Sequence, residues 1–176
     1  KGIAHIKKVK YINSKPIKIN IVELNTNVNP YLKIKPSLAS NKLNSKTTVR
    51  KIAQKDDALV AINGGFFKPQ TGVPLGALMI DEEIITGPIY NRVGIAIFEE
   101  NNKTTFKMAN IDFDIHAVTA AYNLKIDNIN QPRMLSTHVI LYNSLWGNMS
   151  PTPPKNGYNL LVQKTFFGWK KLLKRI

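Results

Sequence analysis

The chain has 176 residues, no cysteine and a formal net charge of +14 at pH 7. Apolar residues make up 43% and charged residues 20%, a balance typical of a globular domain with a hydrophobic core. The missing cysteines exclude disulfide scaffolds, thiolate metal sites and a cysteine nucleophile. No run of 18 apolar residues occurs, so no transmembrane helix is predicted.

Basic residues gather at the two ends of the chain. Residues 1–55 contain thirteen Lys or Arg against one acid, Glu23, and residues 164–176 add five basic residues. Residues 56–163 are slightly acidic. Basic flanks attract anionic glycans, teichoic acids, lipid head groups or nucleic acid, or they reflect a lysine-rich surface. Nucleic acid is disfavoured as a partner because the basic N-terminal part has only two aromatic residues, Tyr11 and Tyr31.

The N-terminal part predicts a β-hairpin. Residues 3–12 and 16–24 alternate apolar and polar side chains, and the turn-forming residues 13–16 lie between them. A third strand is expected at residues 31–35. A short helix should follow, begun by a capping residue among Ser45, Thr47 and Thr48.

Residues 58–62 form an uninterrupted apolar run with two β-branched side chains. The run predicts a central strand buried on both faces. It ends at Asn63, and Gly64 and Gly65 then allow backbone N–H groups to approach a ligand closely. The alternative is a tight turn in which the Asn63 amide bonds the backbone.

Strands and turns dominate the rest of the chain. The expected strands are residues 75–80, 83–86, 93–98, 103–109, 112–121, 137–142 and 158–163. The predicted class is therefore α+β, a strand-rich mixed or antiparallel sheet with one or two helices in a single domain over residues 1–163. Residues 164–176 place four large apolar side chains at helical spacing among basic residues, which predicts an amphipathic tail able to contact membranes peripherally.

Two short blocks carry a resemblance to a known family. Residues 62–67 (INGGFF) and 72–76 (GVPLG) resemble the signature of the phosphodiester glycosidases, a family similar to the catalytic domain of the uncovering enzyme, which removes N-acetylglucosamine from the mannose-6-phosphate tag. The resemblance is closest to bacterial members and extends, through shorter blocks at 92–95, 137–138 and 146–147, over roughly residues 1–163.

The resemblance implies a hydrolase that acts outside the cytoplasm on a sugar phosphodiester in a glycan, exopolysaccharide or cell-wall polymer. The first residue is Lys1 and not Met, so we expect an N-terminal segment to have been removed or left out, and a signal peptide is one candidate for it. Family members usually carry a second glycine-rich segment, an Asp followed by glycines and a serine, which this chain lacks. We therefore expect the chain as given to lack part of the site and to be inactive. The alternative function is a non-catalytic module on the same fold that binds a glycan or another polyanion.

The resemblance implies that Asn63, Arg92 and His138 line the cleft as catalytic residues. Arg92 matches an arginine of the family, and a guanidinium suits phosphate because its planar fork bonds two oxygens. A structural salt bridge is the alternative for Arg92. The predicted substrate-binding residues are Gly64 and Gly65, whose amides form a small anion nest, Arg133, and Trp146, which either stacks on a sugar or packs in the core.

Other polar residues are assigned structural roles. His5 and His116 are expected to be structural, and Asp112 and Asp114 to lie on a solvated strand face rather than act as paired carboxylates. The sequence contains no HxH, HExxH or EF-hand spacing and no phosphate-binding P-loop or GxGxxG. We therefore predict neither a metal nor a cofactor.

Overall fold

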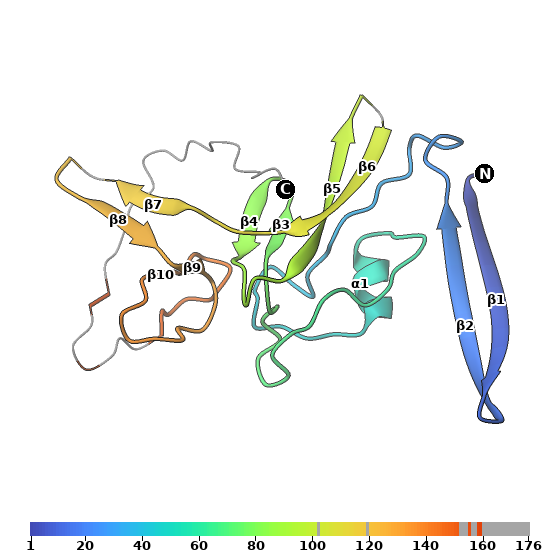
Figure 1. The fold of residues 1–176 in the computed structure, drawn as a ribbon, viewed down its shortest axis with the longest axis horizontal. Coiled ribbons are helices and arrows are strands. Elements are labelled where there is room, and N and C mark those ends of the chain that lie inside the picture. Colours follow the sequence, from blue (N-terminus) through green and yellow to red (C-terminus); the bar gives the residue numbers. More distant parts are fainter. Residues whose placement is uncertain (102, 119, 152–154, 156–157, 160–176) are drawn as a thin grey trace. The chain divides into compact units, whose positions relative to one another are not determined.

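The computed structural model describes residues 1–101, 103–118, 120–151, 155 and 158–159 (Figure 1). The chain divides into two compact units. The first unit consists of Lys1–Lys35 and Ile95–Met108, and the second of the described residues in Pro36–Gly94 and Ala109–Ile176. The predicted extent of one domain over residues 1–163 stays a prediction.

The described residues form ten strands and one helix, so the predicted dominance of strands is confirmed. The sheets are small: β1 pairs with β2, β3 with β4, β5 with β6, β7 with β8 and β9 with β10. The elements are β1 (Ile3–Ile12), β2 (Lys15–Leu24), α1 (Val49–Lys55), β3 (Leu78–Ile80), β4 (Glu83–Thr86), β5 (Val93–Glu100), β6 (Lys103–Asn110), β7 (Ile115–Val118), β8 (Asn123–Ile126), β9 (Asn128–Ile129) and β10 (Ile140–Leu141).

The first unit contains the predicted N-terminal hairpin. Strands β1 and β2 are antiparallel, in register from Ile3 opposite Leu24 to Ile12 opposite Lys15. Asn13 and Ser14 both have left-handed backbone angles, φ 47° and 63°. Two such residues form the tight turn whose twist matches that of paired strands. The turn is thus two residues long, shorter than predicted, and Lys15 already belongs to β2.

The predicted strand at residues 31–35 is wrong. The backbone N–H of Tyr31 donates to the side-chain oxygen of Asn29, at 3.1 Å, and that of Leu32 donates to the Asn29 carbonyl, at 3.2 Å. Such local bonds compete with a strand ladder for the same backbone groups. Nearby, the Lys33 ammonium lies 3.3 Å from Glu99 of β5, on the surface of this unit.

The predicted helix is confirmed in the second unit as α1. Of the three candidate caps, Thr48 begins it, and its hydroxyl accepts a hydrogen bond from the Lys51 N–H at 3.3 Å. The helix is seven residues long. Within the described ranges, no helix has the length and apolar character needed to cross a membrane.

The central strand expected at residues 58–62 is also wrong. The segment has no regular secondary structure, and the Ile62 side chain is 84% exposed. A strand needs a neighbour for its N–H and C=O groups. Residues 59–65 make no backbone hydrogen bond to any residue that the structure describes. The apolar run therefore has no sheet to join.

Strand β4 is the strand that is buried on both faces. Ile85 packs in one core cluster with Leu43 and Val73, and its neighbour Ile84 packs in a second with Ile126 and Ile129. Successive side chains of a strand point to opposite faces, so β4 lies between the two clusters. The Asp81-Glu82 turn joins β4 to β3 as predicted, although β3 begins later than expected, at Leu78.

The strands predicted at 93–98 and 103–109 are confirmed as β5 and β6, which end slightly later than expected, at Glu100 and Asn110. The strands predicted further along the chain are shortened. The strand expected at 112–121 is only β7, which pairs with β8. Of the run at 137–142, only β10 is a strand, and it pairs in parallel with β9, which lies where no strand was predicted. The strand predicted at 158–163 falls mostly outside the described residues. The predicted amphipathic tail at 164–176 lies entirely outside them.

Candidate functional site

The loop that follows Gly64 and Gly65 is closed by backbone hydrogen bonds. The Lys68 N–H donates to the Val73 carbonyl and the Leu75 N–H to the Phe66 carbonyl, both at 2.8 Å. These bonds anchor the chain from Phe66 onward. Upstream, Asn63, Gly64 and Gly65 are exposed, and no atom of the described residues lies within 4 Å of a Cβ added to either glycine.

Arg92 is presented by a strained turn. Tyr90 and Asn91, which immediately precede it, have left-handed φ angles of 56° and 44°. This conformation is uncommon for a bulky residue such as tyrosine, and outliers of this kind concentrate at functional sites. Strand β5 begins directly after Arg92, at Val93, so the turn places the guanidinium at a strand end.

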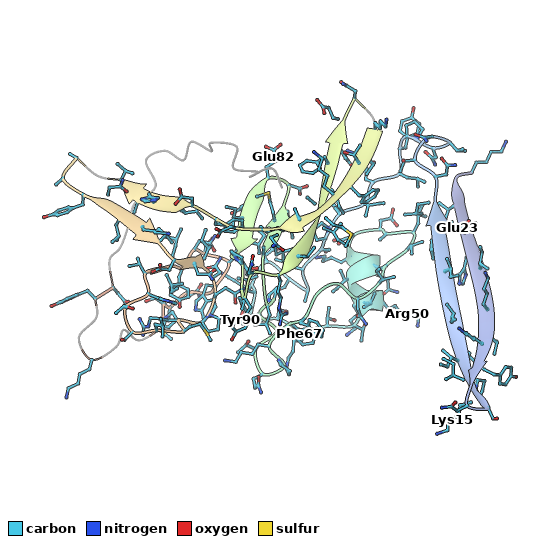
Figure 2. All side chains as sticks on the ribbon, in the orientation of Figure 1. Lys15, Glu23, Arg50, Phe67, Glu82 and Tyr90 are labelled. Carbon is cyan, nitrogen blue, oxygen red and sulfur yellow. The ribbon has the colours of Figure 1, made fainter. Side chains whose placement is uncertain are left out.

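The Arg92 guanidinium contacts an aromatic ring of the loop that follows Gly64 and Gly65, which we call the glycine loop. Its central carbon, Cζ, lies 5.8 Å from the ring centroid of Phe66 and 5.9 Å from that of Tyr90. Both distances are in the range of cation–π attraction. Tyr90 and Phe67, labelled in Figure 2, mark the two segments that meet here. We call this group, comprising Gly64, Gly65, Phe66, Tyr90 and Arg92, the arginine–aromatic site.

The in-plane donors of Arg92 are available for a ligand. The side chain is exposed, and within the described part of the chain its N–H groups meet neither a carboxylate nor a hydrogen-bond acceptor. The structural salt bridge considered for Arg92 is thus not present among these residues. Rings that hold the faces of a guanidinium leave its edge free to bind two oxygens of a phosphate or carboxylate.

His138 is not connected to this site by any contact among the described residues. It is half-buried, and its backbone N–H donates to the Leu135 carbonyl at 3.2 Å. Its ring has no hydrogen-bond partner within the described ranges. Of the three predicted catalytic residues, Arg92 contacts Phe66, three residues after Asn63. The catalytic role of His138 stays a prediction.

Tyr142 is half-buried and its ring contacts that of Trp146. Burial raises the pKa of the Tyr142 hydroxyl above its ordinary value, and the positive charge of Arg133 partly opposes this. The hydroxyl donates to the Gln131 carbonyl at 3.0 Å. The Trp146 ring is tilted against that of Tyr142, with centroids 4.8 Å apart, and packs on the core cluster of Leu43. Of the two roles considered for Trp146, core packing is the one its contacts show.

Sequence reasoning missed a set of fully buried polar residues beside β4. Thr86 and Asn130 are 0% exposed. The Thr86 hydroxyl donates to the Gly76 carbonyl at 2.7 Å, and the Asn130 amide donates to the Ile85 carbonyl at 2.8 Å. These bonds supply β4 with partners that a wider sheet would provide. In the sequence, Thr86 and Asn130 are marked only by being polar residues at the end of a predicted strand and in a loop, which does not indicate that they are buried.

Gln131 belongs to the same buried set. Its Nε2 donates to the Pro74 carbonyl at 3.0 Å, which ties the glycine loop to the segment after β9. Its other side-chain atom, Oε1, has no partner among the residues that the structure describes. Asn130 also donates to the Asn143 side-chain oxygen, at 2.8 Å, so side-chain amides hold these loops together.

The other histidines and acids make local contacts. His116 lies between Asn123, at 2.6 Å, and Asp114, at 3.1 Å, and His5 hydrogen-bonds Asn20 across the first hairpin at 3.1 Å. The structural roles expected for both histidines stay predictions, and these hydrogen bonds are the contacts that their rings make. The described residues contain no group of three or more acids and histidines placed to hold a metal ion.

Comparison with known proteins adds no relative. No family model, no curated protein and no solved structure matches the chain. The resemblance to phosphodiester glycosidases therefore depends on the two signature blocks and the three shorter blocks of the sequence alone.

Proposed function

We propose that this chain is a hydrolase of the phosphodiester glycosidase type, with the arginine–aromatic site as its phosphate-binding element. The observation that carries the proposal is the position of Arg92. Its Cζ lies over the ring of Phe66, the residue after Gly65, and its N–H groups have no acceptor among the described residues. An unengaged guanidinium beside open glycine amides is suited to an anion with several oxygens.

The proposed reaction adds water to the anomeric carbon of the sugar. The bond between that carbon and the phosphate oxygen breaks, the sugar gains the hydroxyl, the phosphate leaves as a monoester, and the remaining proton of the water is released. The departing phosphate acquires a second negative charge. A fixed positive charge at Arg92 therefore stabilises the leaving group more than it stabilises the diester, which is the condition for catalysis.

The remaining predicted residues have roles within this proposal. The exposed Tyr90 ring offers a surface for a sugar, since aromatic faces pack against sugar rings. Asn63 supplies an amide next to the glycines, and His138 is the proposed proton donor or acceptor. We further propose an α+β domain, an extracytoplasmic location and a carbohydrate or anionic glycan as substrate.

A binding module without catalysis is the second candidate. The observation in its favour is that no acid or histidine contacts Arg92 or the glycines among the described residues. Such a site holds a phosphate but has no group to move a proton. The two candidates share the anion site and differ only in turnover.

A model diester of N-acetylglucosamine 1-phosphate tests both candidates. Binding is measured first, by calorimetry, and release of free sugar second. Arg92→Lys keeps the charge but removes the planar fork, so we expect binding about tenfold weaker. Arg50→Lys, in the exposed face of α1, is the matched control and should bind like the unchanged protein.

The outcomes separate the candidates. Sugar release that falls with Arg92→Lys supports the hydrolase and contradicts the expectation that the chain is inactive. Binding that depends on Arg92 without release supports the binding module. Binding that Arg92→Lys leaves unchanged rejects the arginine–aromatic site for either function.

A further inference from the structure

The tip of the β1–β2 hairpin is strongly basic. Lys8 and Lys10 lie on β1, and Lys15 and Lys18 on β2, within the last strand pairs before the turn. The only acid of the first 55 residues, Glu23, lies near the opposite end of the hairpin, where it pairs with Ala4. Figure 2 shows Lys15 at the turn and Glu23 far from it along β2.

The same tip exposes large apolar side chains. Tyr11 is 68% exposed and Val9 57%, and Ile12 and Ile17 are also exposed. Cross-strand partners lie side by side on one face of a sheet. In three of the last four pairs an apolar residue is directly opposite a lysine: Val9 with Lys18, Ile17 with Lys10, and Ile12 with Lys15.

This alternation distinguishes between anionic partners. A soluble polyanion is attracted by the lysines and gains nothing from exposed isoleucine, valine and tyrosine. An anionic bilayer surface gains from both, because apolar side chains enter the interface while lysine stems extend along them to the head groups. Scattered apolar residues on a surface are ordinary, but here they are concentrated at one end of a hairpin among lysines.

We propose that the tip of the β1–β2 hairpin docks on an anionic lipid bilayer. The contact is shallow. The outer edges of β1 and β2 have no strand partner among the described residues, and unpaired backbone groups do not enter the hydrocarbon region. Val9, Tyr11, Ile12 and Ile17 are therefore placed at the level of the head groups. This proposal is independent of the arginine–aromatic site.

Vesicle binding by the full chain provides the test. Vesicles of phosphatidylcholine with phosphatidylglycerol are compared with phosphatidylcholine alone, and soluble heparin serves as a polyanion without a bilayer. Tyr11→Ser/Ile12→Ser removes apolar surface without changing charge, and Lys10→Gln/Lys15→Gln removes charge. Arg50→Gln/Lys51→Gln, on exposed positions of α1, is the control for an equal loss of charge elsewhere.

We expect the apolar variant to bind anionic vesicles about tenfold more weakly and heparin as before, since only the bilayer contact uses those side chains. The charge variant should lose affinity for both, and more than the α1 control does. Unchanged vesicle binding by the apolar variant, or an equal loss toward heparin, would overturn the proposal. Circular dichroism of each variant monitors the fold.

A fluorescent label gives a second readout that does not depend on affinity. Because the chain contains no cysteine, Tyr11→Cys creates a single thiol for an environment-sensitive dye. The dye should shift to the blue on anionic vesicles, whereas the same dye at Lys51→Cys should not. A dye at position 11 that stays in water while the protein is vesicle-bound contradicts docking through the hairpin, and it distinguishes this tip from the basic segment 164–176.

Discussion

Two short apolar segments of the second unit have opposite fates. Residues 58–62 contain five apolar residues in a row, yet Ile62 is 84% exposed. Strand β4 has only two isoleucines between Glu83 and Thr86, yet Ile85 is 4% exposed. The difference is that β4 pairs with β3 across a tight turn and has a core cluster on each face. Burial followed the available partners and not the length of the apolar run.

The largest expected effect tests this difference directly. Ile85→Ala removes a side chain packed between Leu43 and Val73, so it leaves a cavity and should lower the free energy of unfolding by about 3 kcal/mol. Ile62→Ala is the matched change in the exposed run and should cost less than about 0.5 kcal/mol. Urea denaturation measures both. Equal losses would show that residues 58–62 are buried in solution.

The second prediction concerns the polar atoms that support β4. Thr86→Val keeps the shape but removes the hydroxyl that donates to the Gly76 carbonyl, leaving that partly buried acceptor without this bond. We expect a loss of about 1–2 kcal/mol in the free energy of unfolding. Thr47→Val, at an exposed position before α1, should be near neutral. If the two variants unfold at the same urea concentration, the Thr86 bond does not stabilise β4.

The third prediction separates stability from binding in the exposed region. Arg92→Ala removes cation–π contacts at the surface, so the free energy of unfolding should fall by no more than about 1 kcal/mol. Diester binding should weaken more than with Arg92→Lys, because both charge and fork are lost. Arg50→Ala serves as the control. A variant with a much lower free energy of unfolding but unchanged diester binding would show that Arg92 stabilises the fold and does not bind the ligand.

The smallest expected effect is on stability at alkaline pH and concerns Tyr142. Burial raises the pKa of Tyr142 above its ordinary value of 10.0, so the folded state keeps this proton at a pH where the unfolded chain loses it. The associated stability is fully present below pH 10 and declines as pH rises through the raised pKa. Tyr142→Phe should therefore flatten the alkaline decline of stability measured by thermal unfolding. An unchanged slope would place Tyr142 in solvent.

Elements set by near neighbours were predictable from the residues. The β1–β2 hairpin follows from alternation and the turn at Asn13, helix α1 from the cap at Thr48, and the β3–β4 pair from the turn at Asp81. Each depends on contacts between residues close in the chain, which local conformational preferences describe well. The same holds for the presence of Arg92 immediately before a strand.

Tertiary structure decided which apolar segment is buried and which polar residues meet. No local pattern distinguishes residues 58–62 from β4, because the clusters that cover β4 come from Leu43, Val73 and Ile129, far apart in the sequence. Likewise, the contact between Arg92 and Phe66 and the burial of Asn130 arise only when distant loops pack together. Periodicity reports the faces of one element, whereas burial depends on which other elements come to cover those faces.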